Sequence, residues 1–129
     1  MHTIDVNEEL VDLQKKYFDA SAYTKNIKQH LGPALEIIPK IEEDFDLIFM
    51  DADKPNYPAY FDLIIDRLRP GGLLLSDNVL WSGKIVEPLN PKDTSTKALL
   101  EYNRLLAEDD RLETVLLTIR DGLTISRKK

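Results

Sequence analysis

Three oxygen-bearing side chains in this sequence follow apolar runs, and their types are those that bind cations. Asp51 follows the run 45–50, and Asp77 and Asn78 follow the run 73–75 after one intervening residue, Ser76. In open α/β sheets, ligands bind outside the carboxyl ends of the strands. If the two runs are neighbouring strands, two carboxylates and an amide oxygen converge, which suits a hard divalent ion such as Mg²⁺ or Ca²⁺. The structural alternative is that the acids cap the helices that follow.

Lys54 is a possible proton acceptor near the same strand end, because it lies three residues after Asp51. An amine can take a proton near neutral pH only if its pKa is lowered, for instance by burial. The structural alternative for Lys54 is a counter-ion for Asp51 or Asp53. Asp53 itself is interpreted as part of the local structure.

The elements that would position these residues alternate between strands and helices. Apolar periodicity and end signals predict strands at 2–6, 27–31, 45–50, 73–75, 112–119 and 123–126, and helices at 8–20, 34–38, 57–68 and 94–107. The continuous runs at 45–50 and 73–75 predict strands buried on both faces. Asp121-Gly122 predicts a two-residue hairpin. The fold class is therefore α/β, with a mostly parallel sheet and a C-terminal antiparallel hairpin.

Composition narrows the class of protein further. The chain has 129 residues, 43% of them hydrophobic, which predicts one domain, 1–129. A net charge of -6 argues against a nucleic-acid partner, and Arg127-Lys128-Lys129 is interpreted as a solvated tail. No apolar run reaches the roughly 18 residues of a membrane span, and the N-terminus lacks a signal-peptide pattern, so a cytoplasmic location is expected.

Three stretches together carry a family resemblance: FDLIFMDADKPNY, LRPGGLLLSDNVLWSGKI and DGLTI. They resemble the cation-dependent O-methyltransferases, S-adenosylmethionine enzymes related to catechol and caffeoyl-CoA O-methyltransferases. The resemblance covers the whole chain. It implies a Rossmann-like class I methyltransferase fold, of which residues 1–129 would be the C-terminal portion.

The family pattern implies roles for the candidate residues. Asp51, Asp77 and Asn78 would hold Mg²⁺ or another divalent cation, which binds both oxygens of a vicinal dihydroxyaromatic (catechol-like) acceptor. Lys54 matches the catalytic lysine that takes or steers the phenolic proton. Trp81 would line the pocket for the phenolic acceptor, although packing is a comparable interpretation.

Cofactor contacts are implied for Asp5, Ala34 and Asp51. Asp5 would take the ribose hydroxyls of S-adenosylmethionine, where the family more often has Glu. The segment Gly32-Pro33-Ala34 matches one that touches adenine, but the family usually has an acid or amide in place of Pro33.

The first strand and the glycine-rich cofactor loop of the family have no counterpart here, because none of the five glycines forms a G-x-G-x-x-G pattern. We therefore expect weak or no binding of S-adenosylmethionine. The missing strand would lie between the Asp5 and Asp51 strands. Either these two strands pair directly, or a second chain covers their edges, and a homodimer is expected.

Two other interpretations stay open. A response-regulator receiver domain also ends a buried strand in an aspartate, which would here be phosphorylated at Asp51. That class needs an acidic pair after its first strand, and Glu42-Glu43 is not placed there, nor does the hairpin fit. The chain could also be a folded remnant or association module without catalysis.

Overall fold

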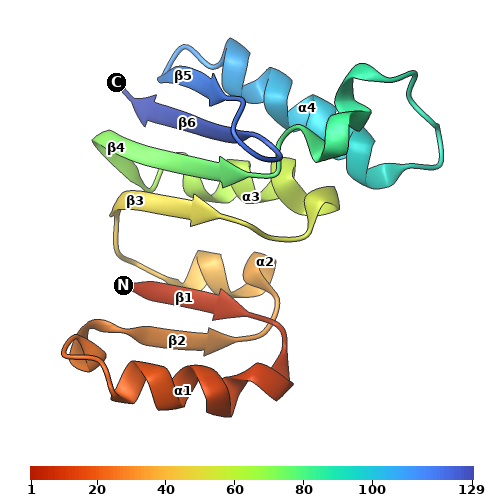
Figure 1. The fold of residues 1–129 in the computed structure, drawn as a ribbon. Helices are drawn as coiled ribbons and strands as arrows, with labels where there is room; N and C mark the ends of the chain where they lie inside the picture. Colours follow the sequence, from red (N-terminus) through yellow and green to blue (C-terminus); the bar gives the residue numbers. More distant parts are fainter. The chain divides into compact units, whose positions relative to one another are not determined.

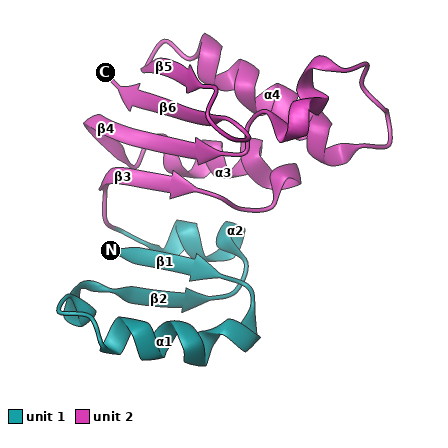
Figure 2. Ribbon diagram, in the orientation of Figure 1, with its two compact units in different colours: residues 1–42 teal, residues 43–129 magenta.

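The computed structural model describes all residues, 1–129, and divides them into two compact units. Unit 1 comprises Met1–Glu42 and unit 2 comprises Glu43–Lys129 (Figure 2). The expectation that residues 1–129 form a single domain stays a prediction. No helix combines the length and apolar character that crossing a membrane requires.

Unit 1 is built around two parallel strands. Its elements are β1 (His2–Asp5), η1 (Glu8–Leu10), α1 (Val11–Asp19), η2 (Thr24–Asn26), β2 (Lys28–Leu31), α2 (Ala34–Ile37) and η3 (Ile38–Lys40). Strand β1 pairs with β2, with Thr3 opposite Gln29. The side chain of Asn7 accepts a hydrogen bond from the Glu9 amide at 3.0 Å, so Asn7 caps this segment as its sequence position predicts.

Unit 2 contains a four-stranded sheet in the order β3-β4-β6-β5 (Figure 1). Its elements are β3 (Phe45–Met50), η4 (Lys54–Asn56), α3 (Tyr57–Ile64), β4 (Leu68–Asp77), η5 (Trp81–Val86), α4 (Thr94–Glu108), β5 (Leu112–Leu117) and β6 (Leu123–Lys128). Strands β3 and β4 are parallel, whereas β6 runs antiparallel to both β4 and β5. The predicted α/β class with a C-terminal antiparallel hairpin is confirmed.

The core of unit 2 lies between the sheet and its two helices, which share one face (Figure 1). Leu74 of β4 is 1% exposed, and the rings of Tyr57 and Tyr102 meet edge to face at 5.1 Å. On the opposite face, Leu47 is 55% exposed and Phe49 60% exposed. The prediction that β3 is buried on both faces is therefore wrong for this chain, because both helices of unit 2 pack on the face that carries Leu74.

Several element boundaries differ from the sequence-based prediction, and the start of β4 and the connection between β5 and β6 differ most. Strand β4 begins at Leu68, which pairs with Phe45, so it includes the Arg-Pro-Gly-Gly stretch expected to separate helix from strand. Residues 118–122 connect β5 to β6, rather than two residues, because Leu117 is the last β5 residue paired with β6. In this connection Arg120 and Gly122 both have positive φ.

Strand pairing also decides between the two arrangements expected for the missing strand. β1 pairs only with β2, and β3 only with β4. Direct pairing of the Asp5 strand with the Asp51 strand is therefore wrong, since the two strands belong to separate sheets in separate units. Coverage of the edges by a second chain stays a prediction.

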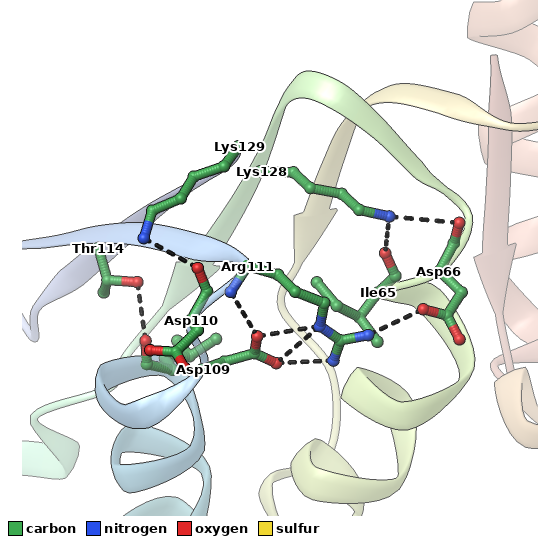
Figure 3. Close-up of polar contacts among 9 residues, drawn as sticks. Ile65, Asp66, Asp109, Asp110, Arg111, Thr114, Lys128 and Lys129 are labelled. Atoms are coloured by element: carbon green, nitrogen blue, oxygen red, sulfur yellow. Dashed lines mark hydrogen bonds and ion pairs between the residues drawn. The ribbon is translucent and has the colours of Figure 1, made fainter.

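The basic C-terminal residues are fixed to the fold rather than forming a solvated tail. Strand β6 continues to Lys128, whose Nζ donates to the Ile65 carbonyl oxygen at 2.8 Å, and the Nζ of Lys129 donates to the Asp110 carbonyl oxygen at 2.8 Å (Figure 3). Arg127 forms an ion pair with Glu113 at 2.7 Å. Antiparallel pairing with β5 brings all three residues to acceptors on the folded chain.

Candidate functional site

The register of β3 and β4 brings the candidate acids together. Met50 lies opposite Ser76, so the next residues, Asp51 and Asp77, leave adjacent parallel strands at the same edge. Neighbouring strands are about 4.8 Å apart. The Nζ of Lys54 lies 3.4 Å from Asp51 Oδ1 and 3.1 Å from the main-chain carbonyl oxygen of Asp77. The sequence-based prediction that these strand ends are neighbours is thus confirmed.

Lys54 is a buried amine at this edge, with only 6% of its surface exposed. Its Nζ also donates to the hydroxyl of Tyr57 and lies 4.4 Å from the centre of that ring. Burial lowers the pKa of the Lys54 ammonium, while the nearby carboxylates of Asp51, Asp77 and Asp121 oppose the shift. Burial likewise raises the pKa of the Tyr57 phenol. Tyr57 therefore stays a neutral partner of the amine.

The oxygen atoms of the candidate metal residues are largely without protein partners. One oxygen of Asp77 accepts from the Asn78 amide nitrogen at 2.8 Å, whereas the other oxygen and the side-chain amide of Asn78 have no hydrogen bond. The Asp51 side chain is 51% exposed and forms an ion pair with Lys54. Asn78 adopts a left-handed conformation, φ 59°, which Asn tolerates better than most residues. Two carboxylates and an amide with open lone pairs fit a hard divalent cation.

Asp53 differs from Asp51 in that both of its oxygens are engaged locally. It accepts from Asn56 Nδ2 at 2.5 Å and from the Tyr60 hydroxyl at 2.5 Å. Burial, followed by the hydrogen bond to Asp53, raises the pKa of Tyr60 to about 12. These contacts support the interpretation of Asp53 as a structural residue of the turn.

Trp81 lies in the segment that leaves the strand end, at the start of η5. Its indole Nε1 is buried and has no hydrogen-bond partner, and the Nζ of Lys84 lies 5.8 Å from its ring. A buried donor without a partner costs free energy in the free protein. Trp81 thus offers an unused donor close in sequence to Asp77 and Asn78.

Sequence reasoning missed a further acid, Asp121, which had been assigned only to a turn. Its Oδ1 accepts from the Ser82 amide at 2.5 Å, 39 positions away in the chain. It also contributes to the electrostatic environment of Lys54. The Asp-Gly pair was visible in the sequence, but only the sheet order β4-β6-β5 carries this turn to the end of β4.

In unit 1, Asp5 is the last residue of β1, and Ala34 is the first residue of α2. Asp5 accepts from the Asn7 amide at 2.9 Å and from Gln14 Nε2 at 2.7 Å, and these hydrogen bonds lower its pKa. Each oxygen keeps a further lone pair. The Gly32 amide donates to the Asp5 carbonyl oxygen at 2.9 Å, so Asp5 and the start of α2 are neighbours within this unit.

In open α/β sheets, ligands bind outside the carboxyl ends of the strands, which is where the acids and the buried Lys54 lie in this chain. Residues 1–129 match the model of the O-methyltransferase family, and the chain belongs to that family. Caffeoyl-CoA O-methyltransferase 5 of Nicotiana tabacum is 35% identical over 97% of this chain and 57% of its own length. Caffeoyl-CoA O-methyltransferase 1 of Arabidopsis thaliana is 36% identical over 97% of this chain and 52% of its own length.

Solved structures agree with this family. The O-methyltransferase from Bacillus cereus in complex with SAH has a TM-score of 0.90 and 27% identity, over 99% of this chain and 62% of that one. TomG from Streptomyces achromogenes, in complex with SAM, has a TM-score of 0.90 and 25% identity, over 99% of this chain and 61% of that one. The chain thus spans little more than half the length of the proteins it resembles. Nothing among these similarities supports a receiver domain.

Proposed function

We propose that this chain carries the metal- and acceptor-binding part of an S-adenosylmethionine-dependent O-methyltransferase acting on a vicinal dihydroxyaromatic. The observation that carries the proposal is the convergence of Asp51 Oδ1 and the Asp77 carbonyl oxygen on the Nζ of Lys54. Family membership supplies the reaction class.

Asp51, Asp77 and Asn78 are the residues that would hold the cation. A divalent cation bound there supplies a Lewis acid that favours the ionised form of a phenolic hydroxyl. The three side chains offer oxygen atoms only, which suits Mg²⁺. The parallel pairing of β3 with β4, in which Met50 lies opposite Ser76, supports placing these residues at adjoining strand ends.

Lys54 is the residue in a position to handle the phenolic proton. Its burial lowers the pKa of the ammonium, and its Tyr57 and Asp77 partners fix the direction of Nζ. Once neutral, Nζ has a lone pair and can accept a proton from an acceptor hydroxyl within hydrogen-bond distance. Trp81, at the start of η5, would border the acceptor.

Asp5 and Ala34 are the residues of unit 1 that would contact the cofactor, which supplies the methyl group. The free lone pairs of Asp5 suit ribose hydroxyls, and Ala34, at the start of α2, would lie against adenine. Asp51 is the third residue proposed to contact the cofactor. Most of the rate enhancement would come from positioning the two reactants, because the protein itself forms no covalent bond in this reaction. We also propose that the protein is cytoplasmic and that it forms a homodimer.

Methyl transfer to 3,4-dihydroxybenzoate tests the proposal. Two proteins are compared: the 129-residue chain, and the same chain extended at its N-terminus with the segment of the Bacillus cereus relative that precedes the matched region. We expect methylated product from the extended protein with Mg²⁺, little without Mg²⁺, and little from the chain alone. Product that is equal with Mg²⁺ and with a chelator would contradict a metal-dependent transferase.

A further inference from the structure

All non-glycine residues with positive φ in this protein lie in two segments, the loop after β4 and the turn between β5 and β6. The loop contributes Asn78 at φ 59°, Trp81 at φ 50° and Ser82 at φ 54°, and the turn contributes Arg120 at φ 48°. A left-handed conformation is strained for residues other than glycine, although less so for Asn. It persists only where the surroundings hold it in place, as is common at functional sites.

The turn supplies the contacts that hold the loop. The amides of Val79 and Leu80 donate to the carbonyl oxygens of Gly122 and Asp121, at 3.2 and 2.9 Å. The Ser82 amide donates to the Asp121 side chain at 2.5 Å. These three contacts thus extend the β4–β6 pairing beyond its last pair, Asp77 and Leu123, and onto the loop.

At Gly122 the turn packs against Leu80 of the loop too closely for a side chain at this position. A Cβ atom on Gly122 would lie 2.5 Å from Leu80 Cγ and 3.1 Å from the Leu80 nitrogen, and Gly122 has φ 83°. From α4, the Nδ2 of Asn103 donates to the Val79 carbonyl oxygen at 3.0 Å. The loop therefore donates hydrogen bonds to the turn through its main-chain amides, and it accepts one from Asn103 of α4 at the Val79 carbonyl oxygen.

We propose that Asp121 is a positioning residue, whose carboxylate fixes the left-handed loop and thereby orients Asn78 toward the cation and Trp81 toward the acceptor. This inference rests on the proposed function for the identity of the cation and acceptor. The contact itself is independent of that function. Of the three turn contacts, only the one from Asp121 Oδ1 comes from a side chain, so it alone can be removed by substitution without altering the backbone.

Trp81 provides a direct readout, because it is the only tryptophan of the chain and lies within the loop. The experiment measures acrylamide quenching of Trp81 fluorescence, and Mn²⁺ binding by the loss of the free-ion electron paramagnetic resonance signal, on the 129-residue chain. Asp121→Ala removes the acceptor. Asp121→Asn keeps an oxygen in place without the charge, whereas Asp121→Glu keeps the charge but displaces the oxygen. Asp110→Ala is the matched control, because the Asp110 side chain has no hydrogen bond or ion pair.

We expect Asp121→Ala and Asp121→Glu to increase the quenching of Trp81 and to weaken Mn²⁺ binding about tenfold, the usual effect of removing a residue that orients a metal ligand. Asp121→Asn and Asp110→Ala should behave as the original chain. If Asp121→Ala does not fold, the measurements on Asp121→Glu alone test the role of the Asp121 carboxylate. Unchanged quenching in Asp121→Glu, or equal losses in Asp121→Asn and Asp121→Ala, would overturn the inference. If the original chain binds no Mn²⁺, the proposed function fails, while the quenching series still decides the role of Asp121.

Discussion

The ammonium nitrogen of Lys54 lies 3.1 Å from the main-chain carbonyl oxygen of Asp77, 23 positions further along the chain. This hydrogen bond joins the segment after β3 to the end of β4. The same nitrogen reaches Asp51, so one buried side chain contacts both strand ends. Because the acceptor on Asp77 is a main-chain atom, the carboxylate of Asp77 stays available for other ligands.

Substituting Lys54 should separate its chemical role from its structural one. Lys54→Met fills a similar volume, and the Tyr57 hydroxyl can still donate to the Asp77 carbonyl oxygen at 3.1 Å. We expect the free energy of unfolding to change by no more than about 2 kcal/mol. Methyl transfer by the extended protein should fall by about 100-fold or more, the usual loss of a general base.

Lys54→Arg is the informative companion variant, because it keeps the positive charge but cannot release a proton near neutral pH. We expect Lys54→Arg to be as inactive as Lys54→Met. Activity retained in Lys54→Arg would assign Lys54 a purely electrostatic role.

Asp51 and Asp53 form a matched pair for testing the metal site, since they are two residues apart and carry the same group. Asp51→Asn should weaken Mg²⁺ binding by about tenfold or more in calorimetric titration, because it removes a charged ligand. Asp53→Asn should leave Mg²⁺ binding unchanged and instead destabilise the turn, since Tyr60 and Asn56 depend on that carboxylate. Equal effects of the two substitutions on Mg²⁺ affinity would argue against a specific role for Asp51.

The Gly71-Gly72 pair in the first part of β4 offers a stability test with an internal control. A Cβ on Gly72 would lie 2.8 Å from the Arg69 carbonyl oxygen and 2.9 Å from Leu68 Cδ1, so Gly72→Ala forces the backbone to move. We expect a loss of about 1–3 kcal/mol in the free energy of unfolding by urea. Gly71→Ala meets nothing within 4 Å and is opposed only by its φ of 81°. It should cost about 1 kcal/mol, and a larger loss than for Gly72→Ala would contradict this explanation.

A pH dependence is expected from Asp109, which accepts from the Arg111 side chain at 2.6 Å (Figure 3). This contact lowers the pKa of Asp109 below that of an unfolded chain. The carboxylate therefore stabilises the fold fully above about pH 4, the ordinary aspartate value, and the stabilisation is lost as the pH falls through the lowered pKa. The difference in unfolding free energy between the original chain and Asp109→Asn should be constant from pH 7 to 5 and shrink at lower pH. A difference that grew on acidification would contradict this sign.

The sequence allowed the strand ends to be predicted because their signals are local. The apolar run at 45–50 coincides with β3, and the acids directly after it are placed by the strand itself. The pairing of β3 with β4, which brings Asp51 beside Asp77, followed from the general habit of α/β sheets. The position of Lys54 near the same strand end was predictable in the same way, because Lys54 lies three residues after Asp51.

Features set by contacts distant in sequence could not be predicted in the same way. The exposure of Phe49 depends on which face α3 and α4 cover, whereas an apolar run alone predicts burial on both faces. The C-terminal Lys128 looked like part of a solvated tail because its acceptor, the Ile65 carbonyl, lies 63 positions away. The contact between Asp121 and Ser82 was hidden for the same reason.

The most direct test of the account is anomalous scattering from crystals of the 129-residue chain grown with Mn²⁺. We predict a single Mn²⁺ peak bound by the side-chain oxygens of Asp51, Asp77 and Asn78, at distances of about 2.0–2.3 Å. A well-ordered edge of the sheet with no peak there at saturating Mn²⁺, or with the three side chains turned away from one another, would contradict the proposed cation site and the transferase mechanism built on it.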